Sequence, residues 1–300
     1  MKIPINELLA EDAEKLKLLK IIGTLSEKRN EAAYAVGGIV RDALLHRANH
    51  DIDIMVVGDA ITLASDVAEA LGIKTIVKYE TFATAMIPYG TYNIEITSAR
   101  KEEYRADSRK PTVEHTNLQE DLSRRDFTIN AMAVDIRPGY WGEFHDLYGG
   151  VKDLEIQIIR TPKDPEDTFF DDPLRMMRAV RFAAQLQYRI HPDSFKAIQK
   201  MAERLSIISR ERIRDELYKI ILSNKPSIGL ILLKNSGLMD SFLPEFSRLM
   251  GVDERDGFGH KDVFYHTAQV VDNICTFTQD PILRFAAMFH DIGKPKTKRF

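Results

Sequence analysis

Two short stretches decide the fold: YAVGGIVRD at residues 34–42 and DIDI at residues 51–54. The first is typical of a strand that ends in a glycine turn and leads into a helix. Glycines let the backbone approach a ligand closely, and the free amides at a helix N-terminus attract phosphate. Arg41, one turn into the helix, adds a cation that can contact the same anion. Taken alone, a glycine pair is more typical of a tight structural turn.

The second stretch is typical of a strand with two carboxylates on one face. Residues i and i+2 of a strand point the same way, roughly 7 Å apart, so Asp51 and Asp53 face outward and the isoleucines face the core. Two such carboxylates can share a divalent metal ion. That suits phosphoryl transfer, because the metal activates a hydroxyl and neutralises a triphosphate. A turn or an exposed strand without metal fits the same spacing.

The chain around these stretches alternates strands with helices before it becomes helical. Leucine and isoleucine recur at helical spacing over 11–28, and a second helix over 60–71 ends at Gly72. Strands are expected at 34–36, 51–57, 75–77, 82–88 and 92–97. Residues 101–125 are polar and predict a long loop. Further helices are expected at 170–186, 194–205, 210–222 and 228–233. The fold class is therefore an α/β head with a small mixed sheet, followed by an all-α part.

The composition is that of an ordinary soluble protein. Of 300 residues, 44% are hydrophobic and 29% are charged. No run is apolar for long enough to cross a bilayer, and the N-terminus lacks the apolar segment of a signal peptide. The single cysteine, Cys275, cannot form an intramolecular disulfide, so a reducing cytoplasm is expected.

The charge is distributed unevenly. The whole chain carries −3, whereas residues 175–219 hold eleven Lys or Arg and five Asp or Glu. A basic helical region in the same chain as an acidic site suits an anionic substrate that approaches carboxylate-bound metal. A solvated helical surface explains the same composition.

Four motifs in order resemble those of the class II tRNA nucleotidyltransferase and poly(A) polymerase family. The matching segments are GGIVRDALL with the following DID, DLSRRDFTINA at 121–131, DPLRMMRAVRF at 172–182 and SRERIRDEL at 209–217. They resemble motifs A, B, D and E, and cover roughly residues 34–220. The resemblance implies a template-independent enzyme that adds CMP and AMP from CTP and ATP to tRNA 3′ ends by Mg²⁺-dependent nucleotidyl transfer.

The resemblance to motif A assigns roles to five residues. It implies that Asp51 and Asp53 bind the catalytic Mg²⁺, and that Gly38 and Arg41 hold the triphosphate. Glu95, in a neighbouring strand, is a candidate third carboxylate. An exposed strand glutamate explains Glu95 equally well.

Motif B adds contacts to the nucleotide. The resemblance implies that Arg125 contacts the nucleotide while Asp126 and Asn130 order its ribose. For Asp126, a salt-bridged helix start is the alternative.

Motif D implies how the base is selected. Asp172, Arg175, Arg178 and Arg181 recur every three residues and predict a stripe on one helix. The family reads the base with the aspartate and the first arginine, and the other two would support them. The chain departs from the family at Asp171, where glutamate is usual.

A second signature follows near residue 300. HDIGKP at 290–295 resembles the start of an HD phosphohydrolase domain, preceded by a further histidine. Two imidazoles and a carboxylate suit a further divalent transition metal. The family pattern needs another aspartate further on, so His266, His290 and Asp291 form an incomplete set. A structural helix pair without metal is the alternative.

Three parts and several alternative functions follow from these motifs. We expect a nucleotidyltransferase head at 1–155, a helical neck and body at 156–250, and the truncated start of an HD-type domain at 251–300. A poly(A) polymerase or A-adding enzyme is the alternative within the superfamily. The loop at 101–125 corresponds to the loop that members of the family need for the switch from C to A addition, so it argues against an enzyme that adds CC only. An HD phosphohydrolase and a non-catalytic RNA-binding module are alternatives from other classes. The oligomeric state does not follow from the sequence.

Overall fold

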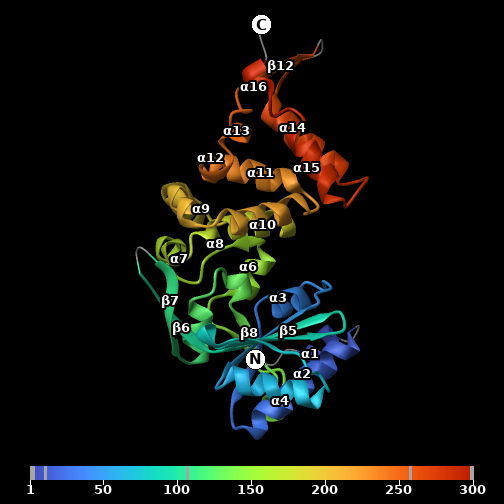
Figure 1. Ribbon diagram of the computed structural model, residues 1–300, viewed down its shortest axis with the longest axis vertical. Helices are drawn as coiled ribbons and strands as arrows, with labels where there is room; N and C mark the ends of the chain where they lie inside the picture. Colours follow the sequence, from blue (N-terminus) through green and yellow to red (C-terminus); the bar gives the residue numbers. More distant parts are fainter. Residues whose placement is uncertain (1–3, 10–11, 106–107, 257–258, 298–300) are drawn as a thin grey trace. The chain divides into compact units, whose positions relative to one another are not determined.

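The chain forms two compact units, each with its own architecture. The computed structural model describes residues 4–9, 12–105, 108–256 and 259–297. One unit consists of Met1–Ile156 with Thr161–Lys163, and the other of Gln157–Arg160 with Asp164–Phe300. Figure 1 shows the elements of each unit.

A seven-stranded mixed sheet forms the centre of the first unit. Its strand order is β3-β4-β5-β2-β1-β8-β9, and the β2–β5 pair is parallel while the other pairs are antiparallel. The mixed sheet of the predicted fold class is therefore confirmed. The strands are β1 (Ala32–Val36), β2 (Asp51–Val57), β3 (Val77–Tyr79), β4 (Thr84–Tyr89), β5 (Tyr92–Ser98), β8 (Met132–Asp135) and β9 (Phe144–Asp146).

Helices cover one face of this sheet. In Figure 1, α2 (Ala13–Lys28) and α4 (Ala60–Ala70) lie along the same side of the strands. The isoleucines of β2 and β5 on that face are fully buried. Gly23 brings α2 close to the chain after β8, because a Cβ there would lie 1.8 Å from the Ile136 carbonyl oxygen. This packing leaves the odd-numbered residues of β2 on the other face. The short helices α1 (Ile5–Leu8) and α3 (Gly38–Leu44) also belong to this unit.

The other face is only partly covered. Met55 packs with Tyr34 and Leu122 in a small buried cluster. Leu122 comes from α5 (Leu118–Ser123), so this helix covers the middle of the face. Asp51 stays exposed and Asp53 half-buried at the start of β2.

The predicted long loop at 101–125 is wrong. Its first part is an antiparallel pair, β6 (Arg100–Arg105) with β7 (Ser108–His115), separate from the main sheet, and α5 follows. Two polar segments pair with each other here, which satisfies their backbone hydrogen-bonding groups. The tip of the predicted loop, residues 106–107, lies outside the described residues.

The second unit is helical, as predicted, apart from two short ladders. The ladders pair β10 (Ile158–Ile159) with β11 (Arg189–Ile190) and β12 (Asp253–Asp256) with β13 (Gly259–Asp262). Its helices are α7 (Pro165–Asp171), α8 (Leu174–Leu186), α9 (Pro192–Met201), α10 (Arg210–Ile221), α11 (Pro226–Asn235), α12 (Leu238–Phe242), α13 (Pro244–Ser247), α14 (Val263–Ile274), α15 (Pro281–Phe289) and α16 (Lys294–Thr297). Throughout the described part of the chain, every helix is too short or too polar to cross a bilayer.

The predicted single helix over 170–186 is also wrong. It breaks into α7 and α8, because the residue before a proline avoids the helical region. Asp172, which precedes Pro173, is extended with φ −140° and ψ 101°. Its Oδ1 atom accepts a hydrogen bond from the Leu174 amide at 3.1 Å. Asp172 therefore stands ahead of α8 rather than in a stripe with the three arginines.

Candidate active site

A row of carboxylates crosses two neighbouring strands of the sheet. In the parallel β2–β5 pair, Asp53 is in register with Glu95 and Asp51 with Asn93. Strands in a sheet lie about 4.8 Å apart, and residues in register share a face. The structure thus brings Asp51, Asp53 and Glu95 onto one face. Glu95 is half-buried and accepts a hydrogen bond from Thr97 Oγ1 at 3.3 Å, so it is more than an exposed strand residue.

The row carries unfavourable charge repulsion. Burial, and then the neighbouring Glu95 carboxylate, raise the pKa of Asp53 to about 6. Asp51 acts in the same direction, whereas the guanidinium groups of Arg125 and Arg41 oppose the rise. A divalent cation relieves such repulsion, and carboxylate oxygens are the ligands that Mg²⁺ prefers. Asp51, Asp53 and Glu95 fit this role.

The glycine turn lies against the carboxylate row. Gly37 has φ +72° at the start of α3, a conformation that side chains rarely adopt. A Cβ at Gly37 would lie 3.1 Å from Arg125 Nη1 and 3.6 Å from Asp53 Oδ2. The sequence prediction named Gly38 as the site glycine, but Gly37 is the one restricted by both conformation and space. The pair of adjacent glycines was the feature of the sequence that could have indicated Gly37.

Arg41 is held in place by two neighbours. Its Nε and Nη2 donate to both oxygens of Asp42 at 2.9 and 2.8 Å, and its Nη1 donates to Asn130 Oδ1 at 2.7 Å. Asn130 Nδ2 in turn donates to Asp126 Oδ1 at 3.0 Å. Asp126 is buried and also accepts from the Phe127 amide at 2.8 Å. Three predicted residues, one from motif A and two from motif B, are therefore joined in one network.

Arg125 depends on a buried aspartate. Asp121 is fully buried, and its Oδ2 accepts from Arg125 Nη2 at 2.9 Å, while Oδ1 pairs with Arg124. Burial alone would raise the pKa of Asp121, but the guanidinium groups of Arg125 and Arg124 outweigh it and hold that pKa below its usual value. Sequence reasoning missed Asp121 as a positioning residue, although it opens motif B.

A second missed residue links the two halves of the site. Asn49 Nδ2 donates to Asp42 Oδ2 at 2.7 Å, and Asn49 Oδ1 accepts from the Asp51 amide at 2.7 Å. Asn49 thus connects the support of Arg41 to the strand that carries the carboxylates. It lies between elements outside the motifs, so the sequence offered no signal for it.

The motif D residues lie in the second unit, where each has its own contacts. Asp172 Oδ2 accepts from Arg212 Nη2 of α10 at 3.2 Å. Arg175 is buried and donates from Nη1 to the Thr168 carbonyl at 3.3 Å. The assignment of both residues to the base stays a prediction.

The two following arginines of α8 stack on one ring. The guanidinium carbons of Arg178 and Arg181 lie 5.6 and 4.2 Å from the ring centroid of Phe182. Arg181 Nε also donates to the buried Glu216 carboxylate at 2.6 Å, which ties α8 to α10. Arg181 therefore has a structural role, and nucleotide support by either arginine stays a prediction.

The three HD-type residues come together although 24 positions separate the histidines. Ligand atoms of His266, His290 and Asp291 all lie within 4.8 Å of one another. His290 Nδ1 lies 2.7 Å from the Ala287 carbonyl oxygen, a contact that places its proton on Nδ1 and leaves Nε2 toward Asp291 at 3.1 Å. Lys294 Nζ lies 2.7 Å from Asp291 Oδ2. This cluster has the donor set for a divalent transition metal.

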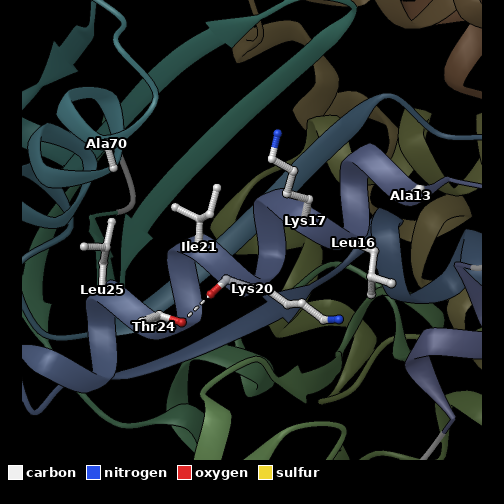
Figure 2. Close-up of a pocket in the computed structure, with 8 residues that line it drawn as sticks. All are labelled: Ala13, Leu16, Lys17, Lys20, Ile21, Thr24, Leu25 and Ala70. Carbon is white, nitrogen blue, oxygen red and sulfur yellow. Dashed lines mark hydrogen bonds between the residues drawn. The ribbon is translucent and has the colours of Figure 1, made fainter.

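A groove on the first unit lies away from the carboxylate row. It measures about 510 Å³ and follows the exposed side of α2, where Thr24 Oγ1 donates to the Lys20 carbonyl at 2.7 Å (Figure 2). α2 packs on the face of the sheet opposite to Asp51 and Asp53. The groove is therefore separate from the candidate active site. Its lining residues are Ala13, Leu16, Lys17, Lys20, Ile21, Thr24, Leu25 and Ala70.

Comparison with known sequences gives two matches in succession. Residues 33–160 match the poly(A) polymerase head domain, and residues 187–250 match the probable RNA- and SrmB-binding site of polymerase A. The CCA-adding enzyme of Lactobacillus helveticus is 42% identical over 209 residues, which cover 68% of this chain and 49% of that protein. The A-adding tRNA nucleotidyltransferase of Halalkalibacterium halodurans is 37% identical over 207 residues, 67% of this chain and 48% of that protein. The chain spans about half the length of these curated relatives.

Solved structures agree with the sequence matches. A tRNA nucleotidyltransferase complexed with a primer tRNA and an incoming ATP analogue matches with a TM-score of 0.70 and 27% identity, over 89% of this chain and 75% of that one. A CCA-adding enzyme in complex with ATP matches with a TM-score of 0.72 and 27% identity, over 100% of this chain and 70% of that one. Fold, motifs and matches together define a nucleotidyltransferase head joined to a helical part. The chain belongs to the class II tRNA nucleotidyltransferase and poly(A) polymerase family.

Proposed function

We propose that this chain adds CMP and AMP, from CTP and ATP, to the 3′ end of tRNA by Mg²⁺-dependent nucleotidyl transfer. The observation that carries the proposal is the row of Asp51, Asp53 and Glu95 beside the glycine turn and Arg41. A row of carboxylates can bind the metal ion that activates an attacking hydroxyl, and the adjacent cationic turn can bind the triphosphate. The relatives named CCA-adding enzyme support the choice of product.

The residues of the first unit divide the chemistry between them. Mg²⁺ held by Asp51 and Asp53, with Glu95 as a third carboxylate, would neutralise the triphosphate and activate the 3′ hydroxyl. The amides of the glycine turn and the guanidinium of Arg41 would bind phosphate oxygens. The 3′ hydroxyl releases its proton to solvent, and its oxygen forms a bond to the α-phosphorus. The bond between that phosphorus and the oxygen bridging to the β-phosphate breaks, and pyrophosphate leaves.

Four further residues would keep those groups in position. Arg125, held by the buried Asp121, would contact the nucleotide. Asn130, held by Asp126, would order the ribose and steady Arg41. Fixed geometry of this kind lowers the barrier to transfer because little reorganisation is needed during reaction.

Base selection would fall to Asp172 and Arg175, supported by Arg178 and Arg181. Cytosine and adenine both present an exocyclic amine beside an unprotonated ring nitrogen. A carboxylate accepts from that amine while a guanidinium donates to the nitrogen. Uracil and guanine present the reverse pattern, which would leave the carboxylate facing a lone pair.

A second candidate function is addition of A alone. The observation in its favour is the A-adding relative, whose identity of 37% is close to that of the CCA-adding relatives. Labelled CTP and ATP should both enter a tRNA that ends at its discriminator base, if CCA addition is correct. Incorporation of ATP alone, and only into tRNA that already ends in CC, would establish the alternative.

We also propose a divalent transition-metal site in the C-terminal part of the chain. His266, His290 and Asp291 would be the ligands, in an HD-type part from residue 251 that follows the head at 1–155 and the neck and body at 156–250. The cytoplasm is the proposed location, since a single cysteine suits a reducing compartment. Equilibrium dialysis with Mn²⁺ or Zn²⁺ tests the metal site, and equal binding by wild type and His266→Ala would exclude it.

A further inference from the structure

The carboxylate row continues as neutral residues across two more strands. Glu95 of β5 is in register with Met86 of β4, and Met86 is in register with Val77 of β3. Residues in register share a face, and neighbouring strands lie about 4.8 Å apart. The row therefore runs from Asp53 to Val77 at the sheet edge, a span of about 14 Å. The carboxylates form one end of it and an uncharged surface the other.

The adjacent row reaches the same edge. Thr97 of β5 is in register with Thr84 of β4, and Thr84 with Tyr79 of β3. The two threonine hydroxyls lie 3.2 Å apart, and Thr97 Oγ1 also donates to Glu95 Oε1 at 3.3 Å. These side-chain contacts place both rows on one face. Tyr79 thus shares its face of the sheet with the catalytic carboxylates.

This edge of the sheet exposes three large apolar side chains close together. Val77 is 43% exposed, Tyr79 45%, and Phe82 of the 3₁₀ helix η1 (Glu80–Phe82) 40%. Edge strands usually carry charges that prevent association with other chains. The charge of β3, Lys78, alternates onto the opposite face of the sheet from Val77 and Tyr79. A face this apolar beside a catalytic row is more typical of a binding surface.

The guanidinium group of Arg100 lies beside these apolar side chains. The guanidinium carbon of Arg100 lies 5.9 Å from the Phe82 ring centroid. Arg100 Nη1 donates to the Phe82 carbonyl at 2.6 Å and to Thr84 Oγ1 at 3.3 Å. Arg100 therefore lies on the face that Tyr79 and Thr84 share. We refer to Val77, Tyr79, Phe82, Met86 and Arg100 as the edge platform.

We propose that the edge platform binds the unpaired 3′-terminal nucleotides of the RNA acceptor. This inference rests on the proposed function, because the acceptor hydroxyl must then reach the carboxylates on this same face. Exposed aromatic rings beside an arginine are the groups that stack bases and contact phosphates in single-stranded RNA recognition. A docked protein would have no need for the surface to continue into the carboxylate row.

The test removes the aromatic rings of Tyr79 and Phe82 and compares the loss of RNA binding with that caused by removing an equally exposed ring elsewhere in the unit. The probe is a fluorescent single-stranded RNA oligonucleotide that ends in CC. Tyr79→Ala combined with Phe82→Ala should weaken its binding about tenfold or more, because each stacked base contributes to affinity. Tyr140→Ala is the control, since Tyr140 is also 45% exposed but lies in the 3₁₀ helix η3 (Pro138–Tyr140) of the same unit. The affinity for CTP and ATP should stay unchanged in all variants.

Charge supplies an independent readout. Arg100→Gln should make the dependence of oligonucleotide affinity on salt shallower by about one phosphate contact. Equal oligonucleotide binding by the Tyr79/Phe82 double variant and Tyr140→Ala would overturn the proposal, as would a wild type that binds no single-stranded RNA. Failure of the wild type to incorporate CTP or ATP would instead refute the proposed function, so the two failures are distinguishable.

Discussion

At the scale of single residues, Asp53 combines an expected catalytic role with an unfavourable environment. Its folded pKa of about 6 exceeds the ordinary value of 3.8. The folded state therefore binds a proton more tightly than the unfolded state. This one group destabilises the fold fully above about pH 6, and the effect disappears as the pH falls toward 4. Activity and stability should respond to its substitution in opposite directions.

Asp53→Asn should lower transfer by at least about a hundredfold, because an anionic metal ligand is lost. The same variant should raise the free energy of unfolding at pH 7 by on the order of 1 kcal/mol, allowing for screening by solvent. The gain should vanish near pH 4. Urea denaturation at several pH values, with and without Mg²⁺, checks this. A variant with near-normal turnover, or one less stable than wild type at pH 7, would contradict the assignment.

Gly37 can be tested against Gly72, a glycine that also has a positive φ. Gly37→Ala and Gly72→Ala both place a side chain at positive φ, +72° and +68°. Each should lose about 1 kcal/mol of stability or more, and Gly37→Ala the larger amount, because its ψ of −128° lies outside the left-handed helical region. Only at Gly37 would the new Cβ meet Arg125 and Asp53, since nothing lies within 4 Å at Gly72. Transfer should therefore fall at least tenfold in Gly37→Ala alone. Equal activity in the two variants would show that the turn has no role beyond its conformation.

These residues also show what the sequence could predict about the site. Strand periodicity was enough to place Asp51 and Asp53 on one face. The position of Glu95 depends on the pairing of β2 with β5, which are about 40 residues apart and joined by no local signal. Asn49 and Asp121 act through hydrogen bonds to other site residues, and such partners emerge only from the folded geometry.

At the scale of elements, the break between α7 and α8 determines how Asp172 is presented. A helical Asp172 would share a stripe with the arginines of α8. In the extended residue, one carboxylate oxygen accepts a hydrogen bond from the Leu174 amide and the other accepts one from Arg212. The rule for residues before proline was available from the sequence and would have predicted this break. The β6–β7 hairpin is different, because its polar segments lack the alternation that signals a strand.

Asp172→Ala should weaken CTP and ATP binding and reduce their advantage over UTP by roughly ten- to a hundredfold. Asp164→Ala is the control, because Asp164 caps α7 by accepting hydrogen bonds from the Glu166 and Asp167 amides. This substitution should cost only about 1 kcal/mol of stability and leave the nucleotide preference unchanged. Titration of each nucleotide with Mg²⁺ present checks both variants. If Asp172→Ala retains the full preference for CTP and ATP, another group reads the base.

At the scale of the whole chain, the proposed binding of tRNA would depend on how many cations can reach phosphate. The stretch 175–219 contains eleven Lys and Arg residues, within a helical part whose architecture the sequence predicted. At least five of them form ion pairs inside the second unit, and Arg175 is buried. The paired cations are Arg181, Lys200, Arg212, Arg214 and Lys219. Net charge alone could not reveal this, because pairing depends on which helices meet.

The dependence of tRNA affinity on salt should therefore be steep but limited. Each neutralised phosphate contributes about −0.9 to the slope of log K against log salt. If the paired cations and the buried Arg175 do not reach phosphate, at most about five cations remain, and this stretch should contribute a slope no steeper than about −5. Lys196→Gln, at an exposed position of α9, should reduce the slope by about one. Arg214→Gln should change it less, because Asp215 already neutralises Arg214 at 2.8 Å. Filter binding over a range of salt concentrations checks all three proteins. A flat plot would exclude phosphate contacts, and equal effects of the two substitutions would show that the ion pairs open when tRNA binds.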